Sequence, residues 1–124
     1  MTMINQTILD VLGHEGVVAI VTQGEHEPHV VNTWNSYVQV VDEQMIIPVG
    51  GMVNTEANLK KNNKIQLTFG SREVQGLQYM GTGFLVTGQA AMETSGSKFD
   101  QVHSKFPWAR AALVVTVESS KQTL

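Results

Sequence analysis

The sequence contains no cysteine. This absence excludes disulfide bonds, thiolate metal sites, iron–sulfur clusters and a cysteine nucleophile. A chain without cysteine suits a reducing compartment, so we expect a cytoplasmic protein. The first residues also lack the basic segment that opens a secretory signal peptide, so no such peptide is expected.

Long apolar runs and excess positive charge are absent as well. No apolar run approaches the roughly 18 residues of a membrane-spanning helix, so we expect no membrane partner. The formal net charge is −3 and the isoelectric point is near 5.7. Nucleic-acid binders depend mainly on lysine and arginine to neutralise phosphates, so a nucleic-acid partner is not expected. These absences favour a small molecule or another protein as the partner.

The composition is that of a folded globular domain. Hydrophobic residues make up 42% of the 124 residues, charged residues 15%, and there are 11 glycines. A chain of this length forms one domain with one core, so residues 1–124 are expected to fold as a single unit.

Apolar and β-branched runs separated by turn residues predict many strands and few helices. The expected strands are residues 16–22, a strand from His29 onward, and residues 37–41, 45–49, 65–70, 83–93 and 111–117. Helices are expected at residues 4–12, 54–63 and 97–106, with Thr55 as the N-cap of the second. This pattern predicts six or seven strands in a small antiparallel barrel with helices at its ends.

Polar residues interrupt the apparent strand at residues 30–37. Asn32, Thr33 and Asn35 stand where a core strand would carry valine, and asparagine is depleted from strands. Buried amides and hydroxyls need partners, so these side chains either bind neighbouring loops at a sheet edge or face a polar ligand. Trp34 and Tyr37 would offer aromatic surface to a planar ring in such a ligand.

A glycine turn follows the strand that ends at Pro48 and Val49. Gly50 and Gly51 lead directly into the second helix, whose first N–H groups and positive dipole end can bind a phosphate or another anion. The same pattern is also typical of a plain strand–turn–helix connection.

No catalytic motif accompanies these features. The chain has no nucleophile elbow, no phosphate-binding P-loop and no dinucleotide fingerprint. His26 and His29 have a metal-like spacing, but they lie in a polar turn where solvated side chains are the expected state. We therefore expect no metal and no catalytic acid, base or nucleophile.

Several stretches at nearly constant spacing resemble the small FMN-binding proteins of the flavin-binding split-barrel superfamily, which includes the pyridoxamine 5'-phosphate oxidases. The similar stretches are residues 15–25, 32–37, 48–52, 55–58, 81–84, 108–114 and 122–124. The resemblance implies a mainly β protein, a six-stranded antiparallel split barrel with short flanking helices. It also implies a homodimer that binds one non-covalent FMN per chain near the subunit interface.

The resemblance also implies a set of cofactor-binding residues. Those expected along the flavin and its tail are Asn32, Thr33 and Trp34, and those expected along the flavin ring are Pro48, Val49, Gly50 and Gly51. Ser71, Thr82 and Gly83 are weaker candidates, and Leu124 is expected to pack beside the flavin of the partner subunit.

The phosphate is expected beside Thr55, where this chain departs from the family. The relatives carry a lysine immediately before that threonine, and this chain has Asn54. The alternative sources of positive charge are Lys60, Lys64 and Arg72.

The resemblance favours a flavoprotein that carries electrons between redox partner proteins, since FMN itself performs the redox chemistry. Two alternatives stay open. One is a small FMN-dependent oxidase or reductase of the same superfamily, which needs a substrate cavity over the ring. The other is a non-redox module that stores or senses flavin.

Overall fold

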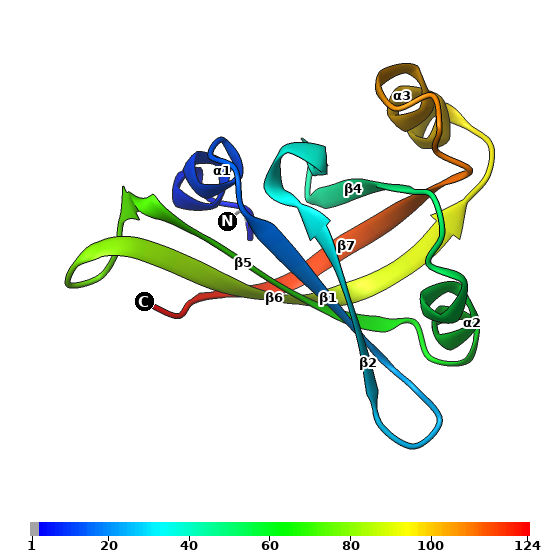
Figure 1. Cartoon of the computed structure of the whole chain (residues 1–124), viewed down its shortest axis with the longest axis horizontal. Helices are drawn as coiled ribbons and strands as arrows, with labels where there is room; N and C mark the ends of the chain where they lie inside the picture. The colour runs from blue at the N-terminus through cyan, green and yellow to red at the C-terminus, as the bar shows by residue number, and fades with distance from the viewer. Residues whose placement is uncertain (1–2) are drawn as a thin grey trace.

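The computed structural model describes residues 3–124, which form three α-helices, one short 3-10 helix and seven strands (Figure 1). In chain order these are α1 (Gln6–Leu12), β1 (Val17–Gln23), β2 (Pro28–Trp34), η1 (Asn35–Tyr37), β3 (Gln39–Val41), β4 (Gln44–Val49), α2 (Val53–Lys61), β5 (Lys64–Gln75), β6 (Met80–Glu93), α3 (Ser97–Lys105) and β7 (Ala111–Gln122).

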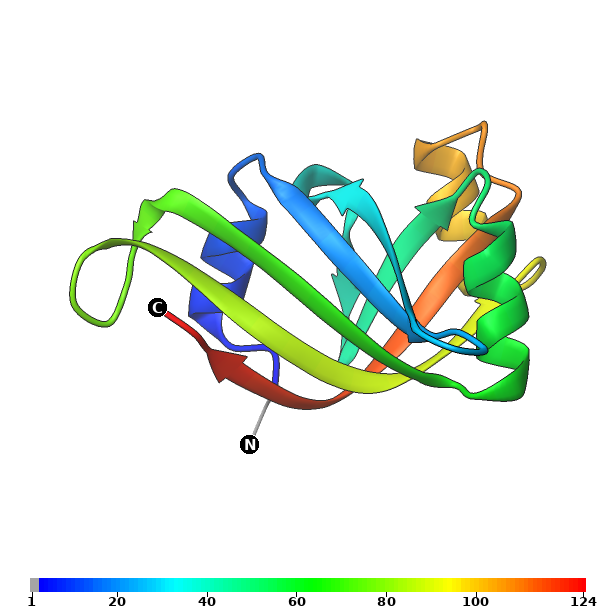
Figure 2. The same ribbon diagram turned by 60° about the horizontal axis from the view of Figure 1, so that its bottom comes forward.

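All seven strands belong to one antiparallel sheet in the order β2-β1-β5-β6-β7-β4-β3. The sheet is strongly curved, yet β2 and β3 remain its two edges, so it does not close (Figure 2). The mainly β prediction is confirmed, and the seven strands agree with the six or seven that the sequence pattern predicts, but the count of six implied by the resemblance is wrong. The seventh is the three-residue β3, which pairs with β4 alone.

The main core fills the concave face of the sheet. It is built from alternate residues of five strands, and α1 adds Ile8 and Val11 to it. A second, smaller core lies on the opposite face of β4 and β7, where α3 adds Val102. Because β4 and the first half of β7 are covered on both faces, these segments are continuous buried runs and do not alternate.

Two helix starts differ from their predictions. The first helix begins at Gln6, because the Asn5 side chain accepts a hydrogen bond from the N–H of Ile8 at 2.9 Å and caps it. The predicted N-cap role of Thr55 is wrong. Met52, in the left-handed conformation with φ 56°, precedes α2, and Thr55 is the third residue of the helix.

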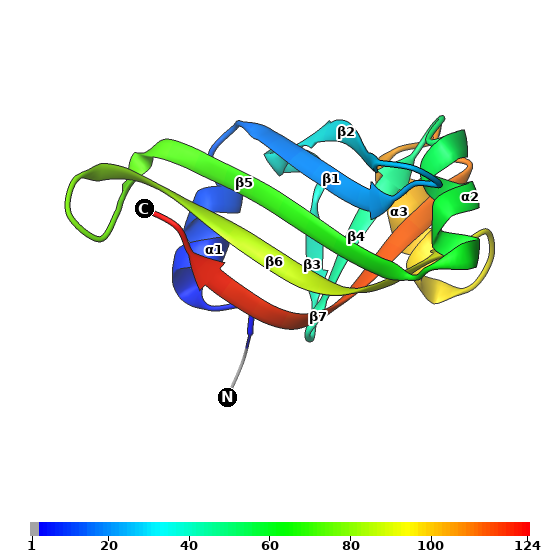
Figure 3. The same ribbon diagram turned by 90° about the horizontal axis from the view of Figure 1, so that it is seen from below.

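The strands β5, β6 and β7 run further than their apolar patterns indicate. Beyond Gly70 the β5–β6 hairpin runs toward the edge of the core and the regular alternation of buried and exposed residues is lost, with Val74 the one buried residue among residues 71–75 (Figures 1 and 2). Leu77, Tyr79 and Met80 near its tip are exposed. The chain end, after β7, lies beside this hairpin (Figure 3).

Asn35 is buried inside the fold and does not face a ligand. The strand β2 ends at Trp34, and Asn35 opens η1 with no exposed surface. Its amide nitrogen donates to the carbonyl oxygens of His14, Gly70 and Val11, at 2.9, 3.2 and 3.3 Å. A Cβ at Gly16 would lie 2.9 Å from this nitrogen, so glycine is required there. The ligand-facing interpretation of Asn35 is therefore wrong.

Replacing Asn35 with alanine should lower the free energy of unfolding by about 2 to 3 kcal/mol, because buried carbonyl groups lose their donor. Asn32→Ala is the matched control, and this exposed change should cost no more than about 0.5 kcal/mol. Urea unfolding of both variants measures the difference. Equal stabilities would show that the Asn35 bonds do not hold α1, η1 and β5 together.

Candidate functional site

The start of α2 has unpaired main-chain donors. Gly50 and Gly51 form an exposed turn between β4 and the helix. Met52 occupies the N-cap position, and no side chain caps the helix. The first N–H groups of the nine-residue helix therefore lack intrahelical partners, and the positive end of the helix dipole adds to their field.

Thr55 adds a second sign that a ligand belongs here. Its side chain is fully buried in the first turn of α2, and its hydroxyl oxygen has no hydrogen-bond partner among the described residues. An unpaired buried hydroxyl costs about 1 to 3 kcal/mol. A phosphate bound over this turn would supply such a partner once the first turn of α2 rearranges to expose the hydroxyl, which has no exposed surface in this structure.

Arg110 lies at the same turn and was missed in the sequence. Its guanidinium donates to the carbonyl oxygens of Gly50 and Gly51, with a shortest distance of 2.6 Å, and forms an ion pair with Glu56 at 3.1 Å. The main-chain N–H of Arg110 donates to the Val49 carbonyl at 2.8 Å. Only the pairing of β4 with β7 brings position 110 to this turn, and the sequence does not reveal that register.

The three predicted residues of β2 do not share one face. Asn32 and Trp34 are exposed on the outer face of the sheet, with Trp34 47% exposed, and Thr33 is buried on the inner face. This alternation follows from the strand period of two. The helix α2 packs against β1 and β2, and its Asn58 side chain donates to the Thr22 hydroxyl at 3.1 Å, near the Pro28 end of β2. Trp34 pairs with Val17 at the other end of the strand, toward the β5–β6 hairpin.

Of the other predicted residues of this group, Pro48 and Val49 are buried and Tyr37 is half-buried. Pro48 and Val49 end β4 inside the protein, so only the glycines that follow them are exposed at the turn. Tyr37 packs against Phe106 and Trp108, with ring centroids 4.9 and 5.8 Å apart, as part of the second core.

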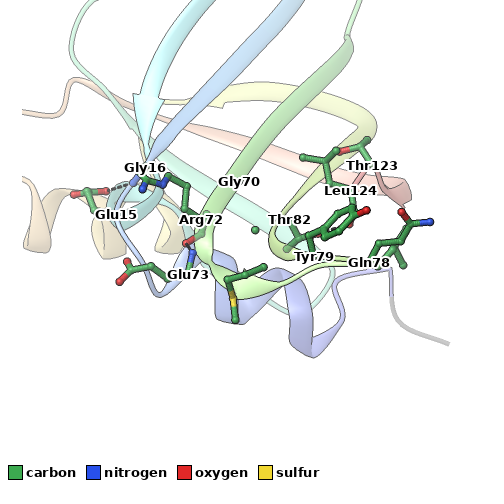
Figure 4. A pocket seen from close by; sticks show the side chains of 14 residues that line it. Glu15, Gly16, Gly70, Arg72, Glu73, Gln78, Tyr79, Thr82, Thr123 and Leu124 are labelled. Atoms are coloured by element: carbon green, nitrogen blue, oxygen red, sulfur yellow. Dashed lines mark hydrogen bonds between the residues drawn. The ribbon is translucent and has the colours of Figure 1, made fainter.

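A second group of predicted residues lines a cavity of about 1200 Å³ between the β5–β6 hairpin, the start of β1 and the chain end (Figure 4). Ser71, Thr82 and Leu124 contribute to its wall, together with Arg72 and Tyr79. Gly83 lies next to this wall on β6, and its carbonyl accepts a hydrogen bond from the N–H of Thr123 at 2.9 Å.

Leu124 is fixed in place by its own hairpin. Its carbonyl oxygen accepts hydrogen bonds from the Thr82 hydroxyl at 2.8 Å and from the N–H of Leu77 at 3.1 Å. The Leu124 side chain is nevertheless 67% exposed. The hairpin therefore presents a positioned but uncovered leucine.

The two groups lie at opposite ends of the sheet, with α2 at one end and the hairpin at the other (Figures 1 and 3). From Lys64, just after α2, to Ser71 in the hairpin, β5 advances by about 23 Å at about 3.3 Å per residue. One chain therefore does not bring all the predicted residues to one place. The side chains that could supply positive charge to the phosphate are also far apart. Arg72 lies at the cavity, and Lys60 lies in the last turn of α2.

A family model described as pyridoxamine 5'-phosphate oxidase matches residues 4–123. The chain belongs to the pyridoxamine 5'-phosphate oxidase family. A relative named FMN-binding protein, from Nitratidesulfovibrio vulgaris (strain DSM 19637 / Miyazaki F), is 53% identical over 123 residues. The match covers 98% of this chain and 100% of the relative. The family predicted from the sequence is therefore confirmed.

Solved structures share the fold of this pyridoxamine 5'-phosphate oxidase family member. HupZ from Group A Streptococcus matches with a TM-score of 0.79 at 18% identity, over 97% of this chain and 94% of that chain. An FMN-binding protein from Syntrophomonas wolfei subsp. wolfei matches with a TM-score of 0.64 at 17% identity, over 86% of this chain and 76% of that chain. These similarities confirm the split-barrel fold.

Two further kinds of feature, a metal-binding cluster and a membrane-spanning helix, are absent from the part of the chain that the structure describes. Among residues 3–124, no group of three or more His, Asp or Glu side chains is arranged to hold a metal ion. None of the helices within the same range is both long enough and apolar enough to cross a membrane.

Glu15 lies at the cavity wall and is held by hydrogen bonds from Ser36 and Gly16. Its carboxylate accepts hydrogen bonds from the Ser36 hydroxyl at 2.8 Å, and from the N–H groups of Ser36 and Gly16 at 3.2 Å. These bonds, the Ser36 hydroxyl first, favour the charged form and lower the pKa of Glu15 below its ordinary value. The carboxylate thereby ties the start of β1 to η1.

Glu15→Gln should destabilise this family member slightly at pH 7, because the neutral amide accepts weaker hydrogen bonds. The carboxylate stabilises the fold above the ordinary pKa of glutamate, and this contribution is lost as the pH falls through the lowered pKa of the folded state. Thermal unfolding of wild type and variant should therefore differ at pH 7 and converge in acid. Ser36→Ala should reproduce the loss; a difference that grew in acid would contradict this role.

Proposed function

We propose that the protein binds one FMN per chain and carries electrons between redox partner proteins. The observation that carries this proposal is the uncapped start of α2 with the unpartnered, buried Thr55 hydroxyl. The 53% identical relative named FMN-binding protein, matched over its whole length, supports FMN as the ligand.

The residues present fit the parts of this cofactor. The first turn of α2 offers main-chain N–H groups to one phosphate. Asn32 and Trp34, exposed on β2 toward the end that pairs with Val17, would offer an amide and an aromatic surface to the ribityl chain and the ring. A single anion-binding site suits FMN better than FAD, which carries a second phosphate and an adenosine.

The protein contributes binding and electrostatic control in this proposal. When bound, FMN supplies the electron chemistry. The chain holds the phosphate at α2 and sets the polarity and solvent access around the ring. An electron carrier needs no protein acid, base or nucleophile, which agrees with the lack of a catalytic motif in the sequence. The absence of cysteine fits our further proposal that the protein works in the cytoplasm.

A homodimer would bring the two separated groups of site residues together. Val17 and Trp34 are paired across β1 and β2, and Val30 lies on the same outer face. All three are exposed apolar residues on a sheet face that no helix of the described chain covers. A two-fold axis through this face, perpendicular to the long direction of the sheet, would bring the hairpin end of one copy beside the α2 end of the other. Leu124 of one copy would then cover the flavin held by its partner.

Binding and electron-transfer experiments on the purified protein test whether FMN is the ligand and whether the protein carries electrons. We expect the apoprotein to bind FMN more tightly than riboflavin or FAD, because only FMN presents a single terminal phosphate. Reduced FMN protein should then pass electrons rapidly to a partner flavoprotein or haem protein in anaerobic stopped-flow measurements. No binding of FMN would refute the proposal. Catalytic turnover of a small molecule would favour the oxidase or reductase alternative, and binding without any transfer would favour storage or sensing.

Leu124→Ala tests the proposed dimer. The change keeps the main-chain hydrogen bonds of residue 124 and removes only the exposed side chain. Losing one buried leucine contact per copy should weaken dimerisation by about tenfold or more. Sedimentation equilibrium measures this, with Leu9→Ala, an exposed leucine on α1, as the matched control. Dimerisation equal to that of wild type would exclude this role for Leu124.

A further inference from the structure

Arg110 makes an unusual set of contacts for a partly exposed arginine. Its Nε donates to the Gly50 and Gly51 carbonyl oxygens at 3.1 and 3.2 Å, and its Nη2 donates to the Gly51 carbonyl at 2.6 Å. The same Nη2 lies 3.1 Å from a carboxylate oxygen of Glu56. The guanidinium thus holds both glycines of the turn and the first turn of α2 at once.

These contacts determine which way the turn presents its donors. In a planar trans peptide the C=O and the following N–H point in opposite directions. Since Arg110 holds the carbonyl oxygens of Gly50 and Gly51, the N–H groups of Gly51 and Met52 point away from the guanidinium. Glycine has the greatest backbone freedom to lose on ordering. Fixing this turn before an anion arrives lowers the ordering cost of binding it.

Arg110 also offsets an unfavourable charge. Glu56 lies in the first turn of α2, and its carboxylate has the same sign as a phosphate bound there. Asn54 brings no positive charge, and Lys60 and Lys61 belong to the last turn. The Arg110–Glu56 ion pair offsets the carboxylate charge beside the proposed phosphate-binding site.

We propose that Arg110 is a positioning residue that sets the preference of this site for FMN over riboflavin. This inference rests on the FMN binding proposed above. Arg110 acts through the turn, by holding main-chain donors toward the phosphate and by neutralising Glu56. It contributes little to the binding of the flavin ring, which riboflavin shares.

The test compares the affinities of FMN and riboflavin for Arg110→Lys, measured by fluorescence titration of the apoprotein. Lysine keeps the positive charge but lacks the planar fork that spans two carbonyl oxygens and a carboxylate. We expect FMN affinity to fall at least tenfold and riboflavin affinity to fall less than twofold. Lys61→Gln is the charge control on the same helix, and it should leave the ratio of the two affinities unchanged.

The outcomes separate this inference from the proposed function. Wild type that binds no FMN overturns both. Wild type that binds FMN, combined with equal losses of FMN and riboflavin or with no loss in Arg110→Lys, overturns the role of Arg110 alone. If circular dichroism shows that Arg110→Lys is unfolded, hydrogen exchange of the Arg110 Nε–H in wild type tests the inference instead.

That measurement is practical because the chain has only Arg72 and Arg110, and Arg72→Lys assigns the two signals. FMN should slow exchange of the Arg110 Nε–H by at least tenfold relative to riboflavin, because phosphate binding locks the turn that this group holds. Equal exchange with both ligands overturns the inference.

Discussion

The uncapped first turn of α2 is the constraint on which the candidate site depends. A helix that begins after two glycines, with Met52 at its N-cap, has donors that no side chain satisfies. The buried Thr55 hydroxyl at the same turn lacks a partner among the described residues. Arg110 fixes the carbonyl side of this turn and leaves the donor side available. In our proposal, an anion of the size and charge of a phosphate would bind at these groups.

The distribution of the other candidate residues explains why a second copy belongs in the proposal. The curved sheet separates α2 from the β5–β6 hairpin, so Thr55 and Leu124 cannot contact one flavin within a single chain (Figure 3). The hairpin holds the main chain of Leu124 but leaves its side chain exposed. The outer face of β1 and β2 is exposed and partly apolar between the two ends. Pairing this face with itself would complete each site from two chains.

The sequence predicted the fold wherever burial leaves a pattern. The apolar runs of β4 and β7 and the helix at residues 97–106 were found because each has a buried face. The extensions of β5 and β6 were not, since buried and exposed residues do not alternate regularly in the hairpin. Asn35 seemed to be a ligand contact because a polar residue in a strand has no local explanation; its three carbonyl partners come from distant segments. Arg110 was missed for the same reason, because only the β4–β7 register brings it to the turn.

The position of the phosphate is the most direct test of the central claim, and a crystal structure of the FMN-bound protein gives it. We predict a phosphate within hydrogen-bond distance of the N–H groups at the start of α2, with Leu124 of a second copy against the flavin ring. A phosphate bound instead in the cavity beside the β5–β6 hairpin, with the start of α2 free of ligand, would contradict the claim.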